Sequence, residues 1–161
     1  MDRQYVGIDF HRRRSVIVRV SATGEKLSTT RVANDPLAIA AAVAEAGPNP
    51  EVVVEATYGW YWVVDLLQAN GARVHLANPQ GLNWGQRRVK NDERDAIDLA
   101  DMLRLGRLPE AWIAPPATRE LRELDRYRAK LVGLRRCWSY MVLARSSQGS
   151  SWATSVTPPG S

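Results

Sequence analysis

Apolar residues recur with a period of two along the first part of the chain, which is the spacing of a β-strand. Residues 4–10 and 13–20 are rich in β-branched side chains and are separated by a short polar link, so they predict a strand pair. A turn sequence, Ala22-Thr23-Gly24-Glu25, separates them from a third predicted strand over residues 27–32. Three strands joined by short links predict an antiparallel meander.

From residue 34 onward, helical and extended patterns alternate. Asn34-Asp35-Pro36 predicts a capped helix start, and Gly47-Pro48 predicts where that helix ends. The same signals of period, capping and turn residues predict the elements that follow. These are a strand over 52–55, a helix over 60–69, a strand over 73–77, a loop over 80–90 and a helix over 92–105. The order predicts an α/β fold in which helices flank a mixed sheet.

After residue 113 the sequence pattern changes from alternating strands and helices to a single predicted helix and a tail. Residues 114–118, rich in Pro and Ala, form a hinge, and Thr118 is placed to cap a helix that runs to Arg136. Leucines recur along this helix on or near one face; they are Leu121, Leu124, Leu131 and Leu134. We expect one domain over residues 1–113, a helix over 114–136, and an aberrant or disordered tail over 137–161.

Composition narrows the class of protein without naming it. The 161 residues suffice for one domain with a core and a short appendage. No apolar run approaches the roughly 20 residues of a membrane helix, and no secretory signal is visible. The single cysteine fits a reducing compartment, so we expect a cytoplasmic protein with no membrane partner. The net charge of +5 suits a polyanionic partner, although it equally suits a solubilising surface.

Two carboxylates end apolar runs, and two more open a predicted helix. Asp9 follows Val6-Gly7-Ile8, and Glu55 follows three valines. Asp92 and Asp95 are three residues apart at the start of the helix, so they share a face. Two strand ends and one helix start can bring four acids to one sheet edge, where their mutual repulsion favours a bound cation. Such oxygen ligands suit Mg²⁺ or Mn²⁺, and a pair of these ions can act on a phosphodiester.

These segments resemble the N-terminal domain of the DEDD transposases of insertion-sequence family 110. The resemblance rests on residues 5–20, 55–59 and 90–96, and it covers roughly residues 4–136. It implies a RuvC-like, RNase H-type domain followed by the start of a coiled coil. It also implies a catalytic metal site for DNA strand exchange, whose ligands are Asp9, Glu55, Asp92 and Asp95.

The same resemblance implies partners for the intact protein: DNA, a guide RNA that bridges target and donor DNA, and further subunits in a homo-oligomer. Family members continue into a C-terminal domain with a nucleophilic serine, and no segment after Arg136 matches it. A frameshift or truncation would explain this, as would an unrelated disordered tail. Ser15, Ser139 and Ser146 have no neighbouring base, so we expect none of them to be a nucleophile.

Basic residues near the acids are the candidates for phosphate contacts. Arg87, Arg88 and Lys90 flank Asp92, and Arg12 and Arg13 follow the first strand. The alternative for each is a solvated surface.

For several further residues we favour a structural role over a functional one. We expect His11 to be solvated in a turn, the alternative being a phosphate contact, and His75 to be a satisfied strand residue. The aromatic run at residues 60–62 is expected to pack in the core rather than stack on bases. Asp98 and Asp101 are expected to be solvated helix positions.

The sequence therefore predicts the metal-binding N-terminal domain of a DNA transposase or recombinase. Two alternatives remain open. One is a RuvC-type junction resolvase, which needs neither a serine domain nor an RNA. The other is a remnant that binds nucleic acid without turnover.

Overall fold

The computed structural model describes residues 3–82 and 91–148. The chain divides into two units, Met1–Ile113 and Ala114–Ser161. The elements of the first unit, in chain order, are β1 (Gln4–Phe10), β2 (Arg14–Ser21), β3 (Lys26–Ala33), α1 (Pro36–Ala44), β4 (Glu51–Glu55), α2 (Trp60–Ala69), β5 (Arg73–Ala77), the 3-10 turn η1 (Pro79–Gly81), α3 (Asp92–Arg104) and β6 (Glu110–Ala111).

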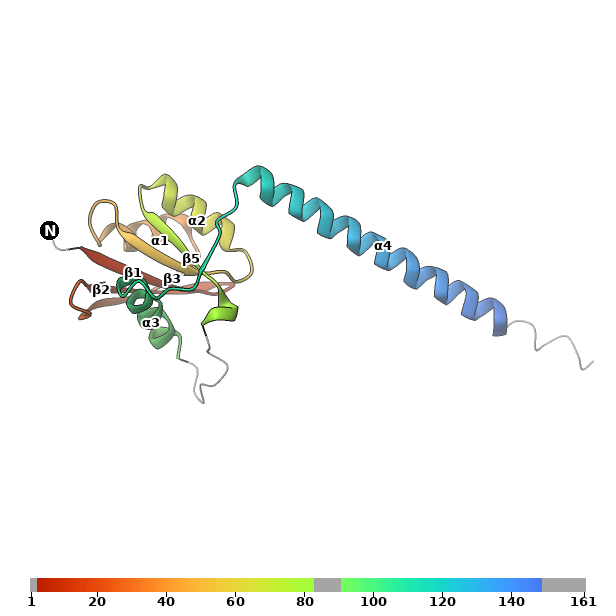
Figure 1. The fold of residues 1–161 in the computed structure, drawn as a ribbon, viewed down its shortest axis with the longest axis horizontal. Helices are drawn as coiled ribbons and strands as arrows, with labels where there is room; N and C mark the ends of the chain where they lie inside the picture. Colours follow the sequence, from red (N-terminus) through yellow and green to blue (C-terminus); the bar gives the residue numbers. More distant parts are fainter. Residues whose placement is uncertain (1–2, 83–90, 149–161) are drawn as a thin grey trace, which may run out of the picture. The chain divides into compact units, whose positions relative to one another are not determined.

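One mixed sheet of the order β3-β2-β1-β4-β5-β6 organises this unit. β1, β2 and β3 form the antiparallel meander, whereas β4 and β5 run parallel to β1. Helices α1 and α2 cover one face of the sheet and α3 covers the other (Figure 1). This strand order and layering are those of an RNase H-like domain, so the predicted RNase H-like α/β fold of this unit is confirmed. β6 was not predicted, because two residues are too short to show a period.

The central strands are apolar at almost every position because both of their faces are buried. On the face of α1 and α2, alternate residues of β1 and β4 pack against residues such as Ile39 and Leu67. On the face of α3, Val18 and Val53 pack with the helix through Ala96 and Leu99. These two cores fix the strand ends on which the candidate site is built.

Gly7 sets how closely α3 lies on the sheet. A Cβ atom at this position would come within 1.9 Å of the Ala96 carbonyl oxygen of α3. No side chain fits in that space, so only glycine lets the backbone of the helix rest against β1. Because Asp92 and Asp95 precede Ala96 on the same helix, this close approach also sets their distance from β1.

The second unit contains helix α4 (Pro116–Gln148). It begins two residues before the predicted start at Thr118, since Pro is favourable in a first helical turn. It also continues past Arg136, where the sequence pattern predicts the start of an aberrant or disordered tail. Residues 137–148 are helical, and the residues after them lie outside the described part of the chain, so the nature of the tail stays a prediction. The predicted leucine face is exposed, with 68% of Leu121 and 52% of Leu134 accessible.

Across the described ranges, no helix combines the length and the apolar character needed to cross a membrane.

Candidate metal centre

The register of β1 and β4 brings two of the predicted acids to one edge of the sheet. The strands are parallel, and Ile8 of β1 lies opposite Val54 of β4. Asp9 and Glu55 are the next residues of their strands, so the register places them side by side. Ile8 and Val54 face α1 and α2. Since successive side chains of a strand alternate between faces, Asp9 and Glu55 face α3.

The start of α3 supplies the other two acids from above this face. Asn91 caps the helix, its side chain accepting a hydrogen bond from the Glu93 backbone N–H. Asp92 and Asp95 follow in the first turn, where carboxylates are favoured by the helix dipole. Asp95 is 4% exposed and Asp9 is 3% exposed. Two buried carboxylates beside further acids are costly unless cations or donors compensate them.

Three ligand atoms converge at this edge. His11 Nε2 lies 2.9 Å from Asp9 Oδ2 and 3.5 Å from Asp92 Oδ1. One ligand atom from each of these residues lies within 4.8 Å of the other two. Arg14 adds a positive charge, with its guanidinium 3.8 Å from Asp92 Oδ2. Glu55 and Asp95 share the sheet edge and the helix turn with this group, but they are not among its three members.

His11 was expected to be a solvated turn residue, and the structure places it between two of the predicted acids instead. The link between β1 and β2 folds back so that His11 stands over the end of β1. The sequence contained a signal for this position. His11 lies two residues after Asp9, and the link between the two strands is so short that His11 must stay close to Asp9. The contact with Asp92, eighty-one positions later, is purely tertiary.

Glu93, between the two predicted ligands, has a structural role that sequence reasoning missed. It accepts hydrogen bonds from the Lys26 ammonium and the Thr29 hydroxyl, and the Arg31 guanidinium lies 3.6 Å away. The hydrogen bonds from Lys26 and Thr29, with the charges of Lys26 and Arg31, lower the pKa of Glu93. This acid therefore ties the first turn of α3 to β3 and fixes the helix that carries Asp92 and Asp95.

The predicted basic contacts divide into two groups. Arg87, Arg88 and Lys90 lie outside the described residues. Arg12 and Arg13 are exposed on the link that also carries His11. Their position beside the acids is compatible with phosphate contacts.

The other residues considered have structural partners. His75, as predicted, is a satisfied strand residue: its Nε2 lies 2.7 Å from Glu51 and its Nδ1 lies 3.0 Å from Glu110. Asp101 is paired with Arg104 rather than simply solvated. The Ser15 hydroxyl donates to Asn34, and the Ser139 hydroxyl donates to the Arg135 carbonyl oxygen. These bonds hold backbone and turn geometry.

Two of the solved structures that are similar to the chain are structures of RuvC from Thermus thermophilus. One is described as RuvC in complex with a Holliday junction substrate, and the other as a RuvC structure. The first is 18% identical, covers 68% of this chain and 99% of its own, and has a TM-score of 0.47. The second is 17% identical, covers 67% and 99%, and has a TM-score of 0.45. Among curated proteins, none matches the chain significantly.

A family model described as a transposase matches residues 6–140. That range includes all four predicted acids, the link that carries His11, and most of α4. The chain belongs to the DEDD transposases of insertion-sequence family 110.

Proposed function

We propose that this chain is the metal-dependent domain of a DNA transposase, with Asp9, Glu55, Asp92 and Asp95 as the ligands of divalent cations. The observation that carries this proposal is the convergence of Asp9 and Asp92. These carboxylates come from β1 and α3, and their oxygen atoms, together with His11, lie within 4.8 Å of one another.

The donor set fits Mg²⁺ or Mn²⁺. These cations prefer carboxylate oxygens, and Mn²⁺ also accepts an imidazole nitrogen. Asp9 and Asp95 are nearly inaccessible, so their ligand atoms have little water to stabilise their charge. Bound cations would supply Lewis-acid stabilisation of the attacking and leaving oxygens of a phosphodiester.

The protein groups around the acids would hold the substrate. Asp9 and Glu55 are fixed by the sheet, and Asp92 and Asp95 are fixed by a capped helix that Glu93 anchors to β3. Arg12, Arg13 and Arg14 are exposed beside them and are suited to contact phosphates on either side of the reacting bond. We assign Arg87, Arg88 and Lys90 the same role.

The intact protein would use this domain with further parts. We propose that it acts with a guide RNA and as a homo-oligomer, as the family resemblance implies.

The test is metal-dependent cleavage of branched and linear DNA with Mg²⁺ or Mn²⁺. Complete strand exchange is not expected of this chain by itself, because Ser15, Ser139 and Ser146 have no neighbouring base that would make one of them a nucleophile. Asp9→Asn should abolish metal-dependent activity. The matched control is Glu45→Gln, which removes an exposed acid paired with Arg19 at the other end of β1. Cleavage of a four-way junction without RNA would favour the junction-resolvase alternative. Metal-dependent cleavage by the unchanged chain that Asp9→Asn fully retains would overturn the assigned site.

A further inference from the structure

A cavity of about 310 Å³ opens at the same sheet edge as the metal centre. Its lining residues come from the end of β1, the link after it, the connection between β3 and α1, and the connection into α2 with that helix's first turn. They are Phe10, Arg12, Asn34, Tyr58, Gly59 and Trp62. Phe10 packs in the core beneath α1 and α2, so the cavity lies on the sheet face opposite to the one that carries Asp9.

Two aromatic side chains make this cavity unusual. Tyr58 is 89% exposed and Trp62 is 36% exposed. Trp62 is held in place by an edge-to-face contact with Phe10, with ring centroids 5.6 Å apart and an interplanar angle of 68°. A tyrosine this accessible buries little apolar area and therefore contributes little to the stability of the fold. An aromatic face beside a cavity can, however, stack on a planar ligand. The sequence predicts that the aromatic run at 60–62 packs in the core, which Trp62 does only in part.

The polar residues of the cavity define the charge of its ligand. Arg12 is exposed and contributes a cation. Asn34 is already engaged at both ends of its amide: it donates to the His11 carbonyl oxygen and accepts from the Ser15 hydroxyl at 2.7 Å. Asn34 therefore stabilises the link that carries His11 and Arg12, and its amide is not placed to hydrogen-bond a ligand. The cavity thus offers stacking and a positive charge, and its described lining residues offer no fixed set of donors and acceptors that would select one base.

The cavity is tied to the metal centre through three short connections. Phe10 directly follows Asp9, Arg12 directly follows His11, and Tyr58 follows Glu55 by three residues. A strand whose phosphate lies at Asp9 and Asp92 can therefore turn a neighbouring base across the sheet edge and into the cavity. We propose that this cavity holds one unpaired nucleobase next to the reacting phosphodiester, an inference that rests on the proposed function.

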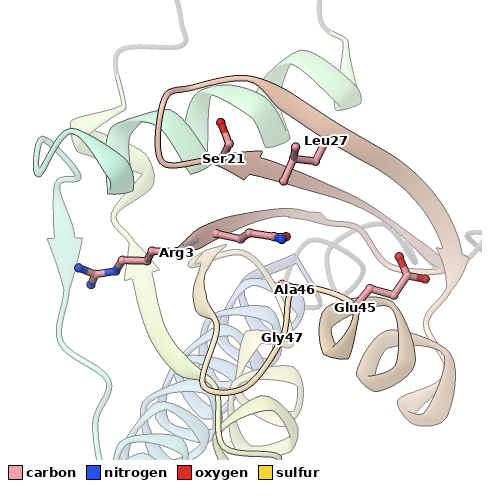
Figure 2. A pocket seen from close by; sticks show the side chains of 7 residues that line it. Arg3, Ser21, Leu27, Glu45, Ala46 and Gly47 are labelled. Atoms are coloured by element: carbon pink, nitrogen blue, oxygen red, sulfur yellow. The ribbon is translucent and has the colours of Figure 1, made fainter. Parts of the chain in front are cut away.

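A second cavity in the same unit lacks, among its described residues, the aromatic lining that a base site requires. It has a volume of about 250 Å³ and lies at the opposite end of β1. Figure 2 shows Ser21 and Leu27 on one side of it and Glu45, Ala46 and Gly47 on the other. No described residue that lines it is aromatic, so it offers no ring on which a base could stack. It does not suit a base.

Duplex DNA with one bulged 2-aminopurine tests the proposal against the same duplex with an abasic residue at the bulge. Both are titrated in EDTA at low salt, so that cleavage plays no part. The unchanged chain should bind the base-bearing duplex roughly 5- to 150-fold more tightly, the usual effect of one stacked base, and should quench the 2-aminopurine fluorescence. Tyr58→Ala should lose most of this preference, whereas Tyr58→Phe should keep it.

The matched control is Trp112→Ala, which removes an exposed aromatic that does not line the cavity and should leave the preference unchanged. Because Tyr58 is almost fully exposed, its replacement should leave the melting temperature unchanged, and Trp62→Ala gives a second test once its folding is checked. Equal affinity of the unchanged chain for the two duplexes would overturn the base site and leave the proposed function standing. Binding to neither duplex would overturn both.

Discussion

At the scale of single residues, the candidate site combines acids that the sequence predicts with a histidine that it does not. Asp9 is nearly inaccessible and contacts His11 at 2.9 Å, and His11 reaches Asp92 at 3.5 Å. A basic nitrogen between two carboxylates offsets part of their repulsion when no cation is bound. The stability of this edge should therefore respond to metal ions and to each of these residues.

Metal binding should raise the melting temperature of the unchanged chain. At a free Mg²⁺ or Mn²⁺ concentration a hundredfold above Kd, the stabilisation is about 2.7 kcal/mol. For a chain of this size that corresponds to a rise of roughly 5–10 °C. Asp9→Asn should blunt the rise because it removes a ligand, and Glu45→Gln should preserve it. Thermal unfolding followed by circular dichroism checks this, and a metal response unchanged in Asp9→Asn would contradict it.

Glu51 should make the stability of the first unit depend on pH in the acid range. Burial acts to raise its pKa, but hydrogen bonds from Arg3 and His75 and the charges of Arg3 and Arg73 outweigh it, so the pKa is lower than the usual 4.5. The unfolded chain therefore binds the proton more readily. The resulting stability is fully present above about pH 4.5 and is lost as the pH falls through the lower native pKa.

Glu51→Gln should accordingly destabilise the chain by about 1–3 kcal/mol near pH 7, since it removes the buried carboxylate that accepts hydrogen bonds from Arg3 and His75. The difference from the unchanged chain should shrink below pH 4.5. Urea unfolding at several pH values measures it. Glu45→Gln should lower the free energy of unfolding by less than about 1 kcal/mol, because the Glu45 carboxylate that pairs with Arg19 is exposed. A Glu51→Gln effect of constant size from pH 7 to pH 3 would show that the charge is not responsible.

At the scale of elements, the packing of α3 against β1 decides whether the four acids can share one centre. The helix is held by the glycine contact at Gly7, by its apolar face, and by the ties from Glu93 to β3. Each of these lies within a few residues of a predicted ligand. Moving the helix away from the sheet would therefore separate Asp92 and Asp95 from Asp9 and Glu55.

Gly7→Ala should push α3 off the sheet. The new methyl group would overlap the Ala96 carbonyl oxygen, and overpacking of this kind costs about 1–3 kcal/mol or more. The variant should also lose part of its metal-induced rise in melting temperature, although no ligand is altered. Gly133→Ala in α4 is the matched control, because nothing lies within 4 Å of its new methyl group; it should stabilise the helix by about 0.5–1 kcal/mol. Full retention of stability by Gly7→Ala would exclude this account of the packing.

At the scale of the whole molecule, an exposed apolar seam runs along α4 beyond the predicted leucines. Its residues alternate three and four apart, the spacing of a coiled-coil seam; they are Leu124, Tyr127, Leu131, Leu134, Trp138 and Met141. The seam continues past Arg136, the residue after which the sequence pattern predicts that the regular helix ends. Six large exposed apolar side chains on one helix predict association with another helix.

We expect the chain to self-associate through this seam. Sedimentation velocity should show an average mass that rises with concentration. Leu131→Ser combined with Leu134→Ser should reduce it, because two seam positions become polar. Ala129→Ser, at an exposed position outside the seam, should leave it unchanged. A monomer at all concentrations, or association that survives the double replacement, would contradict the prediction.

DNA binding by the whole chain should weaken steeply with salt. Each phosphate neutralised contributes about −0.9 to the slope of log K against log salt on duplex DNA. Replacing Arg87, Arg88 and Lys90 by alanine should therefore make the slope shallower by roughly 0.9 for each phosphate that is no longer neutralised. Fluorescence anisotropy between low and moderate salt measures it. A slope that the triple replacement does not alter would exclude these residues as phosphate contacts.

The sequence by itself determined most of the strands and helices and which acids are candidates for the site, because period, capping and strand-end position are local properties. Asp9, Glu55, Asp92 and Asp95 could be selected in this way, and so could the start and end of α2 and β5. β6 and the full length of α4 were not predicted. Two residues are too few to show the period of a strand, and polar residues such as Ser139 and Arg145 interrupt the apolar pattern of the last part of α4.

The tertiary structure alone decided which residues meet. The parallel register places Asp9 beside Glu55. Gly7 allows α3 to pack closely against β1 near that edge. The turn after β1 brings His11 to Asp92. It also placed Tyr58 and Trp62 around a cavity on the other face. No local pattern encodes these pairings, because they join segments distant in the chain and depend on how closely two backbones can pack.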